Sequence, residues 1–260
     1  MGIVNLTPDS FSGDGLVGDV DRAIRHAREQ FEAGSDILDI GAESSRPGAI
    51  PTPEDEELRR LLPVLKEITT WGVPVSVDTY KPAVMRAALS AGATMINDIA
   101  GMVDPASIAA VAGSACAVCV MHMQGEPGTM QQAPVYSDVV GEVRVFLQAA
   151  TARLRAAGVA NERIILDPGF GFGKTLEHNL TLFNELQASG FDGLPVLVGT
   201  SRKSMLGAIT GRPVEQRLAA SVAAALIAAQ KGAKILRVHD VAATRDALAV
   251  WSAIEQGEKK

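Results

Sequence analysis

The hydrophobic and polar positions of this chain fall into short apolar runs separated by longer amphipathic stretches. Each short run consists mostly of Val, Ile, Leu and Met and ends in polar residues or glycine, which is typical of strands buried in a parallel sheet. The pattern predicts eight strands, at Gly2–Asn5, Ile37–Gly41, Val75–Asp78, Met95–Asp98, Ala117–Met121, Ile164–Asp167, Val196–Gly199 and Ile235–Val238.

Between these runs, apolar residues recur at the spacing of helices that pack one face on a sheet. The predicted helices include Val20–Glu32, Glu54–Thr69, Pro82–Ala91, Val139–Ala157, Val214–Lys231 and a closing helix Thr244–Glu255. Strands that alternate with helices over 260 residues predict an α/β fold, a single-domain (β/α)8 TIM barrel.

A doubly wound open sheet is the alternative, but it needs fewer strands. It also usually carries a nucleotide fingerprint in its first strand–helix turn, and residues 5–15 lack one. We find no linker or low-complexity segment, so we expect one domain over residues 1–255 and a frayed tail over 256–260.

Composition and charge narrow the class of protein. Aromatic residues make up 4% of the chain, so the core is expected to consist of Ala, Val, Ile and Leu. The net charge of −6 is spread along the chain without a basic stripe, so we expect no nucleic-acid partner. The sequence has neither a long apolar run nor an N-terminal secretory pattern, so we expect no membrane contact and a cytoplasmic location.

Cys116 and Cys119 have the spacing of a redox or metal-binding pair. However, their neighbours predict a strand, in which positions three apart face opposite sides. No second cysteine pair is present to complete a zinc site, so we predict two buried structural thiols.

The segment Asp167–Lys174, DPGFGFGK, places a carboxylate at the end of a strand and then glycine at every second position. Glycine permits backbone conformations closed to other residues and lets a ligand approach the main chain. Lys174 resembles a phosphate-binding lysine, but the spacing differs from that of a P-loop. We therefore reject nucleotide hydrolysis and predict a loop in close contact with a ligand.

Nearly every predicted strand ends in polar side chains, which in a barrel meet at the rim where catalytic residues lie. Each could be a helix cap or a turn residue on its own, but together they predict a ligand site. Asp78, Asn97 and Asp167 suit a planar heterocycle rich in hydrogen-bond donors. Lys203 could meet its opposite edge, and the apolar floor could come from Met121 and Ile99.

A second group on the same rim is basic. Arg237 and His239 follow the last strand and Arg46 follows the second, and arginine binds phosphate through two parallel hydrogen bonds. Asn5 offers a neutral oxygen that could help to hold Mg²⁺, which prefers oxygen ligands. The residues therefore suggest a flat heterocycle that carries a phosphate group.

Eight motifs carry a family resemblance: MGIVNLTPDSFS, DIGAESSRPGA, VSVDT, INDIAG, VMHMQGEPGTMQ, DPGFGFGK, GTSRKSMLG and RVHDV, in this order. They make residues 1–255 resemble dihydropteroate synthase, the folate-pathway transferase that sulfonamides target. The resemblance implies a pterin-binding barrel that condenses 6-hydroxymethyl-7,8-dihydropterin pyrophosphate with p-aminobenzoate. It also implies a Mg²⁺ requirement and a homodimer.

The resemblance assigns site residues by motif position. The pterin would be held by Asp78, Asn97, Ile99, Met121, Asp167, Lys203 and Arg237. The p-aminobenzoate pocket would comprise Phe11, Ser45, Arg46, Pro47, Phe172, Lys203 and Ser204. Pyrophosphate would contact Asn5, Arg46, Arg237 and His239, with Asn5 also at the metal. The catalytic set would be Asp78, Asp167, Lys203, Arg237 and His239.

These residues suit a reaction in which the pterin C–O bond ionises. Asp78 and Asp167 would stabilise the cation, while the basic residues and Mg²⁺ would stabilise the departing pyrophosphate. Ser45 stands where the family usually has Thr, and Ser12–Gly15 departs from the commoner Ser-Asp-Gly-Gly. No residue is inserted after Phe11, so we expect sulfonamide sensitivity. A folate-dependent methyl carrier and a degenerate pterin-binding protein are the alternatives.

Overall fold

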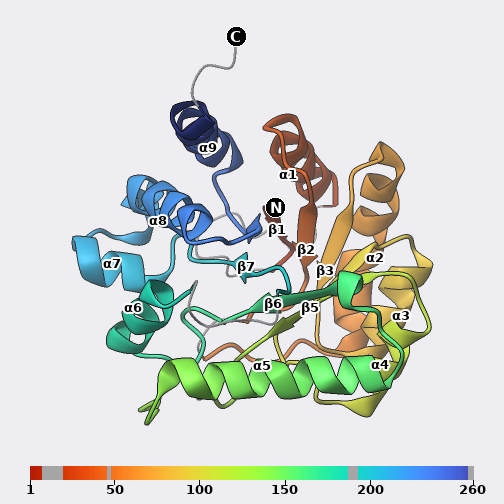
Figure 1. Ribbon diagram of the computed structural model, residues 1–260. Helices are drawn as coiled ribbons and strands as arrows, with labels where there is room; N and C mark the ends of the chain where they lie inside the picture. Colours follow the sequence, from red (N-terminus) through yellow and green to blue (C-terminus); the bar gives the residue numbers. More distant parts are fainter. Residues whose placement is uncertain (8–19, 46–47, 187–192, 257–260) are drawn as a thin grey trace.

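The computed structural model describes residues 1–7, 20–45, 48–186 and 193–256 (Figure 1). In these ranges eight strands alternate with helices, as the hydrophobic pattern predicts. The strands are β1 (Gly2–Asn5), β2 (Leu38–Gly41), β3 (Val75–Asp78), β4 (Met95–Asp98), β5 (Ala117–Met121), β6 (Ile164–Asp167), β7 (Leu197–Val198) and β8 (Ile235–Leu236).

Parallel pairing closes these strands into a (β/α)8 TIM barrel. Strands β1 to β6 pair in chain order, and β7 pairs with β8. Single bridges join Leu166 of β6 to Val196 and Gly2 of β1 to Val238, which completes the ring. Val196 and Val238 pair only through these bridges, so β7 and β8 are shorter than the runs that predicted them.

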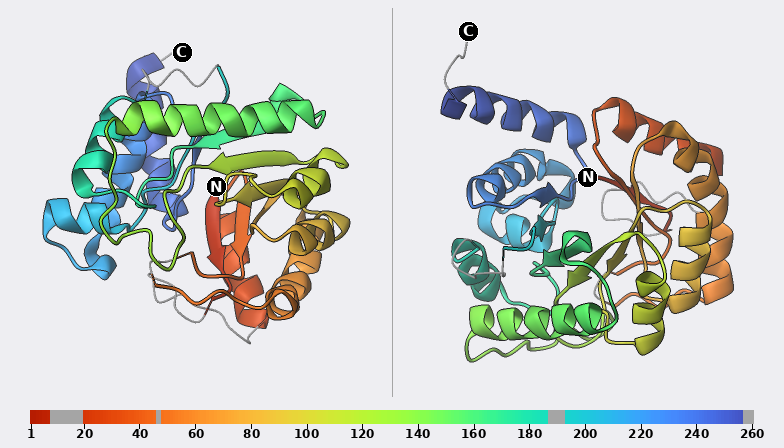
Figure 2. Two further views of the ribbon diagram at one scale, coloured as in Figure 1. Left: turned by 90° about the horizontal axis from the view of Figure 1, so that it is seen from below. Right: turned by 45° about the vertical axis from the view of Figure 1, so that its right-hand side comes forward.

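Helices form an outer layer around the barrel, and α1 and α9, from opposite ends of the chain, lie in the same part of it (Figure 1, Figure 2). The helices are α1 (Val20–Glu32), α2 (Glu54–Ile68), α3 (Pro82–Ser90), α4 (Pro105–Ala112), α5 (Val139–Ala156), α6 (Leu176–Asn184), α7 (Ser204–Thr210), α8 (Leu218–Gln230) and α9 (Val241–Gln256). Among the described helices, none is both long enough and apolar enough to cross a membrane.

Three of these helices, α4, α6 and α7, are absent from the predicted set. They contain only seven to nine residues, or about two turns, so a helical period of apolar residues is hard to recognise in them. Two of them carry local start signals. The Asp104 side chain accepts a hydrogen bond from Ala106 N–H at the start of α4, and Thr175 and His178 form a capping box at the start of α6.

Two predicted helix boundaries also change. The predicted helix Val214–Lys231 is wrong at its start, because a short 3₁₀ turn, Val214–Gln216, precedes α8. Arg217 separates the two and donates hydrogen bonds to the carbonyls of Arg202 and Arg212. The closing helix begins earlier than predicted, at Val241, and residues 257–260 of the predicted tail lie outside the described residues.

The strands have apolar side chains on both faces, which produces two apolar layers. One layer fills the barrel interior with Met1, Met95, Cys119, Ile165 and Leu197. The other lies between strands and helices and includes Cys116, Ile96 and Val118. The two cysteines are thus buried, not joined in a disulfide and in different layers, as predicted from their spacing.

Candidate active site

A cavity lies at the carboxyl ends of the strands, where residues on or just after all eight strands contribute to its lining. The structure gathers twelve of the predicted site residues there. They are Asn5, Ser45, Asp78, Asn97, Ile99, Met121, Asp167, Phe172, Lys203, Ser204, Arg237 and His239. Phe11, Arg46 and Pro47 lie outside the described residues.

Asp78, Asn97 and Asp167 lie at the carboxyl ends of β3, β4 and β6. Asp78 pairs in register with Asn97, which places their side chains next to each other on the barrel rim. Asn97 is 4% exposed, and its side-chain oxygen has no hydrogen-bond partner among the described residues. Because an unpaired buried acceptor is costly, this oxygen suits a ligand that supplies a donor.

Asp167 is 6% exposed and anchors the start of the glycine loop. Its Oδ1 accepts a hydrogen bond from Gly169 N–H at 2.7 Å, which leaves the second oxygen available to a ligand. Burial raises the pKa of Asp167, and the Lys203 charge opposes this shift. The site therefore holds a desolvated carboxylate close to a lysine.

Arg237 is held between two carboxylates. Its Nε donates to Asp39 Oδ2 at 2.6 Å, and its Nη2 donates to Asp78 Oδ2 at 2.9 Å. The Asp39 side chain is fully buried, whereas that of Arg237 is 20% exposed at the cavity. Asp39 therefore fixes the guanidinium from inside the barrel while one face of it remains accessible.

Lys203 lies between the glycine loop and the cavity. Its Nζ donates to Phe170 O and lies 4.6 Å from the centre of the Phe172 ring. Burial lowers the pKa of Lys203 to about 8, against the opposing charge of Asp167. Lys203 is therefore a cation near neutral pH that can lose its proton in mildly alkaline solution.

The glycine loop packs its own backbone against the loop that follows β5. Gly169 and Gly173 have φ of +70° and +58°, and an added Cβ would lie 1.9 Å from His122 O or 2.3 Å from Gln124 O. Glycine is therefore required at both positions. Lys174 is 3% exposed, and its Nζ donates to the carbonyls of Gly169 and Phe172, so this lysine stabilises the loop instead of facing the cavity.

Comparison with known proteins shows to which family the chain belongs. Residues 1–239 match the model of the family described as "Pterin binding enzyme". The chain is 48% identical over 254 residues to dihydropteroate synthase of Haemophilus influenzae, across 97% of this chain and 92% of the relative. The chain belongs to the dihydropteroate synthase family.

Solved structures of family members agree with the fold. The dihydropteroate synthase of Yersinia pestis in complex with a sulfonamide drug has a TM-score of 0.94 and 44% identity, and the match covers 99% of this chain and 93% of that one. The Burkholderia cenocepacia dihydropteroate synthase complexed with 7,8-dihydropteroate has a TM-score of 0.90 and 52% identity, with 98% and 90% covered.

The synthase-family cavity also contains residues that the sequence reasoning did not assign. Glu43, Ser201 and Arg202 stand beside assigned residues in the motifs, and Met130 lies in the loop after β5. Asp39, on β2, has no role among the residues predicted from the sequence. Its position next to a second carboxylate and an arginine depends on three strands meeting, which no local motif reveals.

His239 differs from the basic residue that the sequence suggests for the synthase site. Ser201 Oγ lies 3.0 Å from His239 Nδ1 and accepts a hydrogen bond from His239 N–H. Burial, reinforced by the Arg237 charge, lowers the pKa of His239 to about 3. His239 is therefore a neutral hydrogen-bonding imidazole near neutral pH.

The metal that the synthase family implies has one predicted protein ligand here, Asn5. No group of three or more His, Cys, Asp or Glu suited to a metal exists in the described part of the chain. Asn5 and Thr7 contribute neutral oxygen donors to the cavity. This donor set fits Mg²⁺, which is commonly bound by few protein ligands together with substrate phosphates and water.

Proposed function

We propose that the chain condenses 6-hydroxymethyl-7,8-dihydropterin pyrophosphate with p-aminobenzoate to give 7,8-dihydropteroate and pyrophosphate. One observation carries this proposal. One cavity combines the buried carboxylate of Asp167, the partly buried carboxylate of Asp78 and an amide oxygen that has no partner among the described residues with an accessible arginine. The carboxylates and the amide suit the donor-rich pterin, and the arginine suits the pyrophosphate.

The pterin is proposed to bind between Asp78, Asn97 and Asp167 at its amino edge and Lys203 at its carbonyl edge. Ile99 and Met121, which are 6% and 3% exposed, would pack against the flat ring. Arg237 would lie against the pterin face and reach the pyrophosphate. His239 and Asn5 would complete the pyrophosphate pocket, together with Arg46.

In the proposed reaction the pterin C–O bond breaks first, and pyrophosphate leaves with the electron pair. Asp78 and Asp167 stabilise the cation that remains on the pterin. Arg237 and the neutral His239 stabilise the departing anion by hydrogen bonds. Bound Mg²⁺ would supply additional positive charge to the leaving group, with Asn5 as its protein ligand.

The amine of p-aminobenzoate then forms the new C–N bond and releases a proton to solvent. Its pocket is proposed to comprise Phe11, Ser45, Arg46, Pro47, Phe172, Lys203 and Ser204. The contact between the Lys203 ammonium and the Phe172 ring supports the proposal that these two residues form one wall of the pocket. Because a sulfonamide resembles p-aminobenzoate, the same pocket makes the chain an expected sulfonamide target.

Product formation tests this proposal. Purified chain incubated with the pterin pyrophosphate, p-aminobenzoate and Mg²⁺ is expected to release pyrophosphate and 7,8-dihydropteroate in equal amounts. Chelation of Mg²⁺ with EDTA is expected to suppress both products, and a sulfonamide is expected to compete with p-aminobenzoate. Absence of both products would reject the proposal in favour of a methyl carrier or a degenerate binder.

The kcat/KM of the chain is expected to fall in alkaline solution as Lys203 loses its proton. Its folded pKa of about 8 lies below the ordinary value of 10.5, so the cation is present below this pH and lost above it. A plot of kcat/KM against pH should therefore show an alkaline limb near pH 8. Lys203→Arg should lower activity but move this limb upward, because arginine stays charged. An unchanged limb would contradict the role of Lys203.

Two further properties are proposed. The family resemblance implies a homodimer, and Ile209, Leu218 and Ile227 on α7 and α8 expose apolar side chains that a second copy could cover. We also propose a cytoplasmic location, which the two free cysteines support because free thiols are usual in a reducing compartment.

A further inference from the structure

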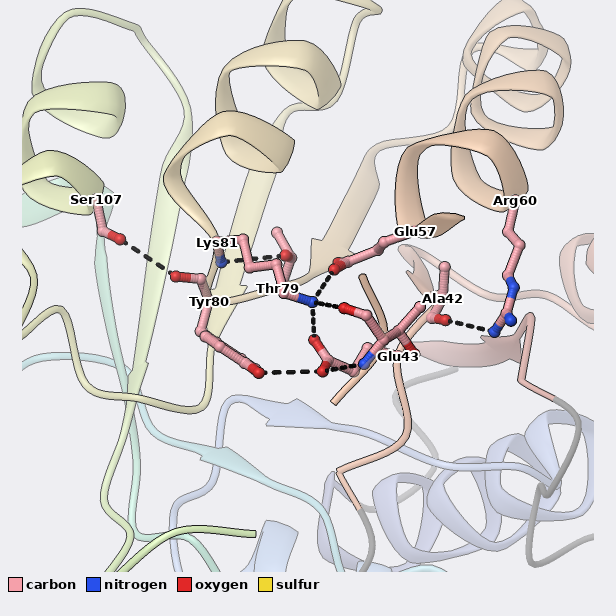
Figure 3. Close-up of polar contacts among 9 residues, drawn as sticks. Ala42, Glu43, Glu57, Arg60, Thr79, Tyr80, Lys81 and Ser107 are labelled. Atoms are coloured by element: carbon pink, nitrogen blue, oxygen red, sulfur yellow. Dashed lines mark hydrogen bonds and ion pairs between the residues drawn. The ribbon is translucent and has the colours of Figure 1, made fainter. Parts of the chain in front are cut away.

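The loop that follows β2 begins at Glu43 and reaches Thr52 just before α2. Both ends contact Lys81, which lies in the short connection between β3 and α3. Figure 3 shows Glu43 at one end beside Tyr80 and Lys81 of this connection. Ser44 and Ser45 of this loop line the active-site cavity. We refer to Glu43, Thr52, Glu57 and Lys81 as the stem cluster.

Lys81 forms the centre of the stem cluster. Its Nζ donates to Glu43 Oε2 at 2.5 Å, to Thr52 O at 2.6 Å and to Glu57 Oε2 at 2.6 Å. An ammonium has three donors, so all of them are used, and the three acceptors surround it in Figure 3. Lys81 thereby contacts both ends of the loop and the first turn of α2.

Glu43, at one end of the loop, also binds Thr52 at the other end directly. Its Oε1 accepts hydrogen bonds from Thr52 N–H at 2.9 Å and from Tyr80 OH at 3.0 Å, while Oε2 accepts from Lys81. The carboxylate is therefore held from both of its oxygens. Because Glu43 itself lines the cavity, a shift of this side chain would move the cavity wall together with Ser44 and Ser45.

The stem cluster is buried enough for these contacts to hold their geometry. The side chains of Glu57, Glu43 and Lys81 are 1%, 8% and 16% exposed. Two carboxylates share one ammonium, and Glu57 Oε1 has no partner among the described residues. Burial raises the pKa of Glu57, although Lys81 opposes the shift. Such a buried cluster of charges adds little net stability, so its role is better explained by orientation of the loop.

We propose that Lys81, supported by Glu57, is a positioning residue for the p-aminobenzoate pocket, because it holds both ends of the loop that carries Ser44 and Ser45. This inference rests on the proposed function. Among the described residues, Lys81 does not itself line the cavity. Its effect is transmitted through Glu43 and Thr52, and it should concern the second substrate more than the pterin.

Steady-state kinetics of Lys81→Met test this role. Without the ammonium, we expect KM for p-aminobenzoate to rise by about tenfold or more, because a loosened pocket orients its ligand less well. KM for the pterin pyrophosphate should change much less, because Asn97 and Asp167 lie on β4 and β6 and Asp78 is held by Arg237. Arg59→Met is the matched control. Arg59 pairs with Glu56 on the exposed side of α2, so its loss should leave both constants unchanged.

A second variant separates positioning from simple destabilisation. Lys81→Met leaves two buried carboxylates without their cation, which can lower stability by itself. The double variant Lys81→Met/Glu57→Leu removes one charge of each sign and should recover stability, measured by urea denaturation. The selective rise in KM for p-aminobenzoate should persist in it. Equal changes in both KM values, or no change in a folded variant, would overturn the proposal.

Amide hydrogen exchange measures how firmly the loop is held and does not depend on catalytic activity. The Thr52 amide, which donates to Glu43, should exchange faster in the double variant than in the wild-type chain and stay protected in Arg59→Met. An unchanged exchange rate would refute the positioning role. If the wild-type chain formed no dihydropteroate while this amide lost protection as expected, the proposed function would fail and the loop anchoring by Lys81 would stand.

Discussion

Asp167→Asn is expected to reduce kcat by roughly 10²–10³-fold, which is the usual cost of losing one group that stabilises a transition state. The amide keeps the size of the carboxylate and its acceptor for Gly169 N–H, so the loop should stay in place. It removes the negative charge that stabilises the cation on the pterin. It can also turn a donor toward the donors of the ring, so pterin binding should weaken as well.

Stopped-time assays of pyrophosphate release measure kcat, and calorimetric titration with the pterin measures its binding. Asp55→Asn is a suitable control, because Asp55 is an exposed carboxylate in the first turn of α2, away from the cavity. It should retain wild-type kinetics. Near-normal turnover of Asp167→Asn would remove this carboxylate from the mechanism.

The second large effect concerns Arg237 and its buried partner. Arg237→Ala should lower the free energy of unfolding by about 3–5 kcal/mol, because it leaves the fully buried Asp39 without its cation. It should also raise KM for the pterin pyrophosphate more than KM for p-aminobenzoate. Urea denaturation and steady-state kinetics measure the two results independently.

The double variant Arg237→Met/Asp39→Leu separates the loss of stability from the loss of affinity for the pterin pyrophosphate. It removes Arg237 and the fully buried Asp39 together, and apolar replacements of buried pairs are often neutral for stability. Asp78 also loses its cation, but its side chain is 15% exposed at the cavity and can be solvated. Stability should therefore recover while the selective loss of pyrophosphate-substrate affinity remains. An equal change in both KM values would contradict the assignment of Arg237 to the anion.

Much of the barrel could be predicted from local patterns. The bounds of β1, β3, β4, β5 and β6 agree with the predicted runs, because each is a short apolar run that ends in a polar residue or is followed directly by one. The helices α4, α6 and α7 were not predicted, since two turns offer too little periodicity. The predicted start at Val214 is wrong because Val214–Gln216 form a separate 3₁₀ turn and α8 begins only after Arg217.

The candidate site could be predicted as a set of residues but not as a set of contacts. Asp78, Asn97 and Asp167 are identifiable because each ends an apolar run, and the motifs add their roles by resemblance. Lys174 and His239 show the limit of this reasoning. Their chemical types suggest phosphate binding, yet the structure uses Lys174 to bind loop carbonyls and keeps His239 neutral through burial.

The sequence by itself determined the alternation of strands and helices, the polar rim and the family, because these depend on residue order and local spacing. Only the tertiary structure decided which charges meet. Arg237 binds Asp39, 198 positions away, and Lys81 binds Glu43 and Glu57 across two loops. Such pairs form because the parallel strands of a closed barrel bring distant residues to one rim, where burial then sets their charge states.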